Sequence, residues 1–299
     1  MEAGTATARA ATRARIRTMA ADYFDMMKPR VQTLLLFTTI TTMYVAGSPS
    51  IGLVALTCLG GALSAGGAGT INHWFDRDLD AIMVRTSNRP IPAGRVAPNH
   101  ALIFGVTLGI AGFALLSLTV NVLAAVLSLC GLLGYVFVYT IWLKRRTPQN
   151  IVIGGAAGAV PPLVAWAATT GKLSGSALYL FAIVFYWTPP HFWALSLLMK
   201  DEYAKAGVPM LPVVRGEEET RFQIVLYTVL LVAVTILPFA GRLFGTVYFI
   251  AALLLGGAFI WLALVLMRRR DRRSALRVYL SSLAYLAVLF AAMVVDVHV

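Results

Sequence analysis

The sequence predicts an all-α, polytopic membrane protein with nine transmembrane helices. Of its 299 residues, 59% are hydrophobic and 13% are charged, and the mean hydropathy is +0.78. A soluble domain carries about 25% charged residues, so this chain has too few charges to cover a surface in water. Long apolar stretches recur along the chain, and the loops between them are charged and uncharged in alternation. These observations exclude an ordinary soluble protein, a disordered chain and a nucleic-acid-binding domain.

Nine apolar segments are long enough to cross a hydrocarbon core of about 30 Å as helices. The segments are 31–47, 51–71, 101–119, 122–143, 151–169, 177–198, 222–240, 245–267 and 277–296. Four connections are short and nearly uncharged, namely 47–50, 119–121, 169–176 and 241–245. The connections 72–100, 144–150, 199–221 and 268–276 carry most of the charge.

The net charge of +12 is explained by membrane topology, because the cations gather on one side of the predicted spans. With nine spans, all of the 25 Lys and Arg residues except Lys172 and Arg242 fall on the side of the N-terminus. The positive-inside rule places that side in the cytoplasm or, in an organelle, in the matrix. Every acid except Asp296 lies on the same side, although the rule does not require it. A face that carries carboxylates and many cations suits a polyanion bound with a divalent metal.

The first 20 residues are rich in Ala, Thr and Arg and have no continuous apolar run, so they are not a secretory signal. We expect a disordered tail at 1–20, with an organellar transit peptide as the alternative, and a single transmembrane domain over 21–299. Cys58 and Cys130 lie in apolar runs, where we expect buried small side chains and no disulfide framework.

A row of oxygen-bearing side chains stands at the end of the second span. Asn72, Asp76 and Asp80 follow one another at intervals of four, which on a helix places them on one stripe, whereas Asp78 points elsewhere. Such side chains repel one another unless a cation lies among them. Oxygen ligands suit Mg²⁺, which is usually held by a couple of carboxylates together with substrate phosphates.

Cations follow this row directly. Arg85 and Arg89 lie on a loop stiffened by Pro90 and Pro92. Guanidinium groups hold phosphate oxygens in a bidentate manner, so the pattern predicts a diphosphate site at the membrane surface. The alternative is that Asp76 and Asp80 pair with Arg77 and Arg85 and only cap the end of a helix.

The motif Asn72-x-x-x-Asp76-x-x-x-Asp80, followed by Met83-x-Arg85-Thr86-x-x-Arg89-Pro90, resembles the first aspartate-rich motif of the UbiA-type intramembrane prenyltransferase superfamily. The resemblance implies a bundle of nine transmembrane helices. It also implies that Mg²⁺ is used to bind an isoprenyl diphosphate, whose prenyl chain is transferred to a ring acceptor.

Further segments resemble the haem-farnesylating branch of that superfamily, the haem O synthases. They are Lys28–Val31, Tyr139–Asn150, Pro189–Leu195, Lys200–Tyr203 and Ala206–Pro212. The resemblance implies transfer of the farnesyl group of farnesyl diphosphate to a vinyl group of haem B, with a hydroxyl from water, giving haem O for terminal oxidases. It also implies the bacterial inner membrane with a cytoplasmic site, the mitochondrial inner membrane being the alternative. Membrane lipid and a downstream haem-modifying enzyme or oxidase assembly factor are the expected partners.

The same resemblance assigns roles to individual residues. Asn72, Asp76 and Asp80 are the metal ligands and, with Asp201, the catalytic residues. Arg77, Arg85, Arg89, Lys144, Arg145 and Arg146 bind the diphosphate, whereas Tyr139, His191, Trp193 and Tyr203 contact haem or the prenyl chain. The chain departs from the superfamily in lacking a second Asp-x-x-x-Asp, because Lys205 stands four residues after Asp201. Whether Asp201 or Glu202 reaches the metal stays open.

Alternatives remain for His191 and for the function. A histidine within an apolar span is either a haem-iron ligand or hydrogen-bonded to a neighbouring helix. One rival function is prenylation of another ring, such as a quinone precursor or chlorophyllide. Another is transport of an anionic amphiphile, which predicts charges near the membrane midplane and paired broken helices.

Overall fold

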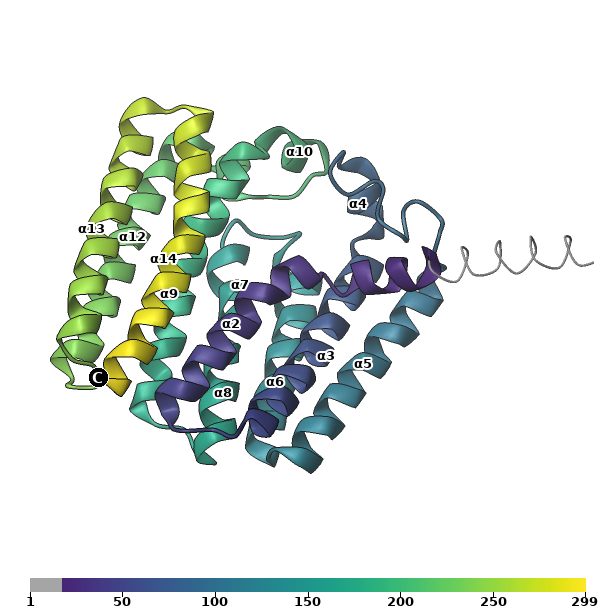
Figure 1. Ribbon diagram of the computed structural model, residues 1–299. Coiled ribbons are helices and arrows are strands. Elements are labelled where there is room, and N and C mark those ends of the chain that lie inside the picture. The colour runs from purple at the N-terminus through teal and green to yellow at the C-terminus, as the bar shows by residue number, and fades with distance from the viewer. Residues whose placement is uncertain (1–17) are drawn as a thin grey trace, which may run out of the picture.

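The computed structural model describes residues 18–299, and this part of the chain is helical without any strand (Figure 1). Residues 18–26 form a first helix, so the last three residues of the predicted tail are helical, and the rest of that tail lies outside the described residues. The remaining elements are α2 (Pro29–Ala46), α3 (Ile51–Phe75), α4 (Arg77–Ile82), α5 (Pro98–Thr119), α6 (Val122–Leu133), η1 (Gly134–Leu143), α7 (Asn150–Gly158), α8 (Val160–Thr170), α9 (Gly175–Leu198), α10 (Lys200–Lys205), α11 (Leu211–Val214), α12 (Gly216–Ala240), α13 (Thr246–Arg269) and α14 (Arg272–His298).

The all-helical, multi-pass architecture is confirmed. Within residues 18–299, seven helical stretches are long and apolar enough to cross a membrane. Two of them join successive elements, α6 with η1 and α7 with α8. The predicted segments 31–47 and 177–198 are also helical, as α2 and α9, but they are not among these seven. The count of nine spans therefore stays a prediction.

Side chains and prolines fix where several helices begin. Ser50 accepts a hydrogen bond from the backbone N–H of Leu53 at the start of α3, and Asn121 does the same for Ala124 at the start of α6. These caps satisfy N–H groups that the first helical turn leaves unpaired. Pro29 opens α2 and follows Lys28, whose backbone is left-handed with φ 57°. This turn aims the start of α2, and with it the Lys28 side chain, towards the end of α3.

Helices α3 and α5 lie against one another along a row of glycines. A Cβ atom added at Gly67 would stand 2.6 Å from the carbonyl oxygen of Gly105 and 2.9 Å from the nitrogen of Gly109. Such a distance leaves room for hydrogen alone, so the two backbones are in direct contact. Small residues permit this close packing in membrane helices. The contact holds the part of α3 that carries Asn72 and the residues after it.

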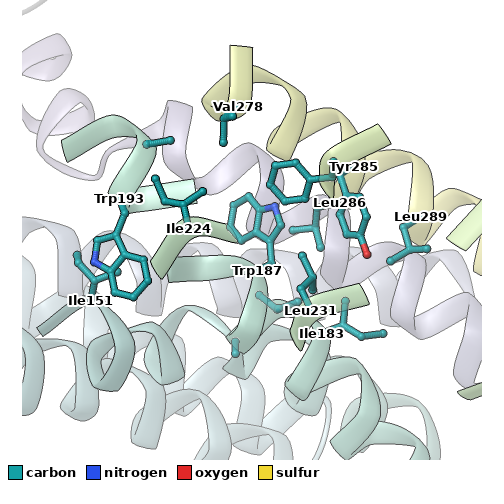
Figure 2. Packing of buried hydrophobic residues seen from close by; sticks show 14 of the residues in the cluster. Ile151, Ile183, Trp187, Trp193, Ile224, Leu231, Val278, Tyr285, Leu286 and Leu289 are labelled. Carbon is teal, nitrogen blue, oxygen red and sulfur yellow. The ribbon is translucent and has the colours of Figure 1, made fainter. Parts of the chain in front are cut away.

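Aromatic side chains fill the other half of the bundle, where α9 packs against α12 and α14 (Figure 2). Ile151, Trp187, Trp193, Tyr285 and Leu286 all belong to this buried cluster. Large apolar side chains, by contrast, cover the outer surfaces of the spans, as expected for contact with lipid. The expectation that both cysteines are buried was wrong, because Cys58 is half-buried and Cys130 is exposed. An apolar environment in a membrane protein includes the lipid-facing surface.

Candidate active site

The carboxylate motif lies at a break between two helices. Helix α3 ends at Phe75, Asp76 has φ −87° and ψ 8°, and α4 starts at Arg77. Asn72, Asp76 and Asp80 therefore do not lie on one uninterrupted helix, since the helix is interrupted at Asp76. The backbone N–H of Asp80 nevertheless donates to the carbonyl oxygen of Asp76 at 2.8 Å, so the two residues remain one turn apart. The break turns Asp80 towards the loop that follows it.

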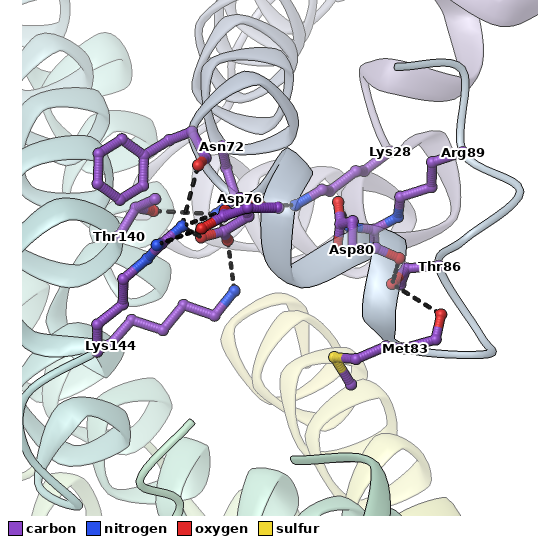
Figure 3. A network of polar contacts seen from close by, with 12 residues as sticks. Lys28, Asn72, Asp76, Asp80, Met83, Thr86, Arg89, Thr140 and Lys144 are labelled. Carbon is purple, nitrogen blue, oxygen red and sulfur yellow. Dashed lines mark hydrogen bonds and ion pairs between the residues drawn. The ribbon is translucent and has the colours of Figure 1, made fainter. Parts of the chain in front are cut away.

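Asn72, Asp76 and Lys28 form the centre of a buried polar network (Figure 3). The amide Nδ2 of Asn72 donates to Asp76 Oδ2 at 2.7 Å and to Thr140 Oγ1 at 3.2 Å. On its other side, Asn72 Oδ1 accepts from Lys28 Nζ at 2.5 Å. Burial, together with the charges of Arg89 and Lys144, lowers the pKa of Lys28 to about 7. This cation thus belongs to the site rather than to the solvated surface.

Two cations from the loop after η1 approach the carboxylates. Lys144 Nζ forms an ion pair with Asp76, whose side chain is fully buried. Arg145 Nη2 lies 3.5 Å from Asp76 Oδ1, and its guanidinium binds both oxygens of Asp78 at 2.7 Å. This bidentate hydrogen bonding lowers the pKa of Asp78. Asp78, as predicted, points away from the stripe; it is exposed and holds Arg145 beside Asp76.

Asp80 has its own cation. Arg89 Nη1 donates to Asp80 Oδ2 at 2.7 Å, and the hydroxyl of Thr86 donates to the Asp80 carbonyl oxygen at 3.0 Å. The side chain of Asp80 is 5% exposed and that of Arg89 is 21% exposed, so the pair is partly screened from water. The alternative pairing of Asp76 and Asp80 with Arg77 and Arg85 is therefore not what the structure shows.

An unusual helix supplies one wall of the site. In η1 the turns are wide, with a hydrogen bond from the N–H of Lys144 to the carbonyl oxygen of Tyr139, five residues earlier. Wide turns of this kind are rare and are frequently found at functional sites. They bring residues five apart to one side, so that Tyr135 meets Lys28 with 3.4 Å between hydroxyl and Nζ, and Thr140 meets Asn72. Lys144, four residues after Thr140, forms the ion pair with Asp76.

Some of the predicted diphosphate ligands lie away from the carboxylates. Arg77 is exposed and donates to the carbonyl oxygen of Trp74 at 2.7 Å, with its guanidinium 5.4 Å from the centre of the Trp74 ring. Arg85 and Arg146 are also exposed. The backbone N–H of Arg85 donates to Glu202 Oε2 at 3.3 Å, which joins the loop after α4 to α10. The structure thus brings Arg89, Lys144 and Arg145 together, and leaves Arg77, Arg85 and Arg146 at the rim.

The residues predicted to contact haem or the prenyl chain lie within the bundle, whereas Asp201, predicted to be catalytic, lies at its surface. Tyr139 lies 5.3 Å from Tyr135, ring centre to ring centre, and packs on Gly154 of α7. Trp193 is 2% exposed, and its indole N–H is buried without a hydrogen-bond partner. In α10, Tyr203 is buried whereas Asp201 is exposed.

His191 is hydrogen-bonded to a neighbouring helix. Its Nδ1 lies 2.6 Å from Ser282 Oγ of α14, and its ring stacks between those of Trp187 and Tyr279. The predicted alternative of a hydrogen bond to a neighbouring helix is thus confirmed. It does not exclude a bond to haem iron, because an imidazole has two nitrogen atoms.

The oxygen atoms present fit a hard divalent cation. Asp76 Oδ1 is buried and has no hydrogen-bond partner, although Lys144 and Asn72 occupy the other oxygen. Among residues 18–299, no cluster of three or more His, Cys, Asp and Glu side chains is gathered as a metal site. The available donor set is therefore two carboxylates, Asp76 and Asp80, with the amide oxygen of Asn72, which Lys28 Nζ occupies in this structure. This set suits Mg²⁺, which keeps several waters and shares its shell with phosphate oxygens.

Sequence reasoning missed three residues of this site as individual members. Lys28 is part of a sequence motif, but the motif does not indicate its hydrogen bond to Asn72. Tyr135 and Thr140 lie within an apolar segment that carries no sign of a polar site. The signal for Lys28 was a cation directly before a proline at the start of a span. Nothing in the sequence marks the five-residue spacing of η1.

Comparison with known proteins gives the family. The family model described as the UbiA prenyltransferase family matches residues 35–291. The protoheme IX farnesyltransferase of Roseiflexus sp. (strain RS-1) is 54% identical over 277 residues, which cover 92% of this chain and 52% of that protein. The protein of the same name from Symbiobacterium thermophilum is 52% identical over 280 residues, covering 92% and 94%. The chain spans about half the length of the Roseiflexus relative and most of the Symbiobacterium one.

Solved structures share the fold. A structure described as digeranylgeranylglyceryl phosphate synthase superposes with a TM-score of 0.77 at 20% identity, over 93% of this chain and 98% of that one. A UbiA homologue from Archaeoglobus fulgidus, bound to GPP and Mg²⁺, gives a TM-score of 0.64 at 16% identity, over 91% and 99%. Helix packing is thus similar even where few residues are identical.

Proposed function

Because the chain belongs to the UbiA prenyltransferase family, we propose that it transfers the farnesyl group of farnesyl diphosphate to a vinyl group of haem B. The acceptor is inferred from the relatives named protoheme IX farnesyltransferase, one of which matches along 94% of its own length. The structural observation that supports the reaction is the buried network in which Asn72, Asp76 and Asp80 lie among Lys28, Arg89 and Lys144. Membership of this family also argues against the transporter.

The network can bind a metal–diphosphate complex. Asp76 and Asp80, with Asn72, would hold Mg²⁺, which supplies charge neutralisation for a leaving diphosphate. The cations that now pair with these carboxylates, Lys144 and Arg89, are then available to the phosphate oxygens, with Lys28 and Arg145 beside them. Fixed donors in a partly dry site stabilise charge as it develops on the leaving group.

The proposed reaction forms one carbon–carbon bond and adds one water molecule. The bond between C1 of the farnesyl group and its diphosphate oxygen breaks, and the electron pair leaves with the diphosphate. The terminal carbon of the haem vinyl group bonds to C1, and water adds to the other vinyl carbon and releases a proton. The products are haem O and diphosphate. Arg77, Arg85 and Arg146, at the rim, are proposed to guide the diphosphate inwards, and Tyr139, Trp193 and Tyr203 to line the path of the apolar substrates. Asp201, exposed at the start of α10, stays a predicted catalytic residue.

The membrane and the orientation are part of the proposal. The relatives are bacterial, and the cation-rich loops favour a site on the cytoplasmic side of the inner membrane. Replacing Cys58 and Cys130 by alanine and placing one cysteine at Lys172 or at Arg273 tests this. In intact cells, an impermeant maleimide should label the cysteine at 172 and leave that at 273 unlabelled. The reverse pattern would overturn the orientation.

The activity is tested with the purified full chain in detergent. Farnesyl diphosphate, Mg²⁺ and haem B should yield a farnesylated and hydroxylated haem, detected by mass spectrometry. A protein that leaves haem unchanged but prenylates 4-hydroxybenzoate would overturn the acceptor while leaving the family chemistry intact.

A further inference from the structure

A cavity outside the active site lies where the ends of several helices meet. Its volume is about 170 Å³, and it is lined by residues of α9, α12, α13 and α14 and of the turn between α13 and α14. This turn lies at the same end of the bundle as α4 and α10 (Figure 1). Leu197, Leu198, Leu266 and Ala275 supply the apolar lining. A water molecule takes about 30 Å³ in the liquid, so the cavity has room for a phosphate group.

Arg221 presents unused hydrogen-bond donors to this cavity. Its side chain is 9% exposed and forms an ion pair through Nη2 with Glu217, one turn earlier on α12. A guanidinium carries several N–H donors, and Arg221 makes no other hydrogen bond within residues 18–299. None of its nitrogen atoms is among the buried atoms that are sealed without a partner, so the remaining donors reach the cavity that Arg221 lines. Glu217 is engaged twice, because Lys200 Nζ also lies 3.2 Å from its carboxylate.

The turn between α13 and α14 leads to a second cation of the cavity, and this one is unpaired. Arg270 has a left-handed backbone with φ 58°, which residues other than glycine seldom adopt, and its guanidinium pairs with Glu218 at 3.0 Å. The carboxylate of Asp271 accepts from the backbone N–H of Ser274 at 2.6 Å and caps α14. Arg272 makes no hydrogen bond or ion pair within the described part of the chain. Each acid that lines the cavity is thus engaged, whereas Arg272 is free to bind an anion.

An exposed apolar stripe leads away from the cavity along α14. Arg272, Leu276 and Leu280 follow one another at intervals of four, so they lie on one stripe of the helix. Leu276 is 44% exposed and Leu280 is 53% exposed, whereas Ala275 and Val278 are buried. The stripe therefore runs from a cation at the end of the span to apolar side chains within it. A free phosphate would contact only the first part of this arrangement, whereas a phospholipid would contact all of it.

We propose that this cavity is a headgroup site for an anionic membrane lipid. Arg221 and Arg272 bind the lipid phosphate, and Leu276 and Leu280 contact an acyl chain. Guanidinium groups bind phosphate oxygens in a bidentate manner. Basic pockets between membrane helices on the cytoplasmic side bind anionic headgroups, and this cavity lies on the cation-rich side of the chain. The site is separate from the active site, because no residue of the carboxylate network lines it.

Native mass spectrometry of the full chain in a neutral detergent tests the site. Phosphatidylglycerol is anionic and phosphatidylcholine is zwitterionic, so the two lipids differ mainly in headgroup charge. The wild type should bind phosphatidylglycerol about tenfold more tightly than phosphatidylcholine or better, as expected for charge-assisted hydrogen bonds to a phosphate. Arg221→Gln and Arg272→Gln should each weaken the binding of phosphatidylglycerol by about tenfold, because each removes such bonds. Equal affinity of the wild type for the two lipids would overturn the site.

Arg273→Gln is the matched control. It removes the same charge from the neighbouring position, and Arg273 is exposed and does not line the cavity. In about 0.5 M salt, which screens exposed charges, its affinity for phosphatidylglycerol should stay within about twofold of that of the wild type. Equal losses in Arg272→Gln and Arg273→Gln would overturn the site and leave only a general attraction between cations and anionic lipid. Arg272 is exposed, so Arg272→Gln decides the matter if the variant at the buried Arg221 does not fold.

Inorganic phosphate distinguishes a lipid from a free anion as the occupant. It has no acyl chain, so it should bind far more weakly than phosphatidylglycerol, as measured by calorimetry. Phosphate binding as tight as that of phosphatidylglycerol would overturn the lipid as the occupant. These measurements use neither farnesyl diphosphate nor haem. A chain that fails to farnesylate haem can therefore still bind the lipid, and a chain without the lipid site can still farnesylate haem.

Discussion

Lys28 and Asn72, 44 residues apart in the chain, are joined by a hydrogen bond of 2.5 Å from the lysine ammonium to the amide oxygen. The bond ties the start of α2 to the end of α3, and it places a cation beside Asp76 and Asp80. The site formed around Asn72, Asp76 and Asp80 therefore includes a lysine that is distant from them in the sequence.

Lys28→Gln should raise the KM for farnesyl diphosphate by about tenfold or more, because a charge-assisted hydrogen bond to a phosphate is worth roughly 1.5–3 kcal/mol. Steady-state kinetics with haem B at saturation measures the change. Arg30→Gln is the matched control, since Arg30 is exposed at the first turn of the same helix. Equal KM values for Lys28→Gln and the wild type would remove Lys28 from the diphosphate site.

Asp76→Asn and Asp80→Asn should each abolish turnover, with a loss of at least about a hundredfold, because each removes a charge that neutralises or orients the metal–diphosphate complex. Asp78→Asn is the comparison within the same motif: Asp78 is exposed and acts only through Arg145, so its loss should cost about tenfold or less. Product formation followed by mass spectrometry measures all three. Full activity of either Asp76→Asn or Asp80→Asn would contradict the metal-site assignment.

Removal of the divalent metal should stop the reaction, and addition of Mg²⁺ should restore it. Since oxygen ligands and phosphates form the shell, Mn²⁺ should substitute, and its EPR signal should report binding. In Asp80→Asn the Mn²⁺ signal of the bound ion should weaken in the presence of farnesyl diphosphate. An undiminished signal in that variant, or full activity of the wild type with a chelator present, would argue against the site.

Gly67→Ala should destabilise the protein by about 1–3 kcal/mol, as overpacking in a tightly packed interior does. The added methyl group would stand 2.6 Å from a backbone oxygen, which cannot rotate away as a side chain can. Gly61→Ala, on the same helix, meets no atom within 4 Å and should be neutral or slightly stabilising. Thermal unfolding in detergent compares the two, and equal midpoints would refute the close contact of α3 and α5.

Much of the architecture could be predicted from composition, because length and apolarity are what a membrane requires of a helix. The carboxylate motif was equally evident, since charged groups at the end of a span have few structural explanations. The break of α3 at Asp76 could not be predicted from the same residues, because a spacing of four is as regular in a continuous helix as in an interrupted one.

The partners of the carboxylates were harder to predict. Asp80 pairs with Arg89, which was among the candidates, rather than with Arg85, and only the folded loop decides between them. Lys144 was assigned to the diphosphate, and the structure adds its contact with Asp76 across 68 residues. Contacts of this sequence separation depend on helix packing, which periodicity does not specify.

The wide turns of η1 make the winding of one apolar segment a determinant of the site. Tyr135 and Thr140, five residues apart, face the same side in this helix. The same residues wound as an ordinary α-helix would be equally apolar and equally well hydrogen-bonded. Each residue of an α-helix turns the chain by about 100°, so five residues would place Thr140 about 140° away from Tyr135 around the helix. Mean hydropathy would not change, yet Thr140 could no longer meet Asn72 while Tyr135 meets Lys28.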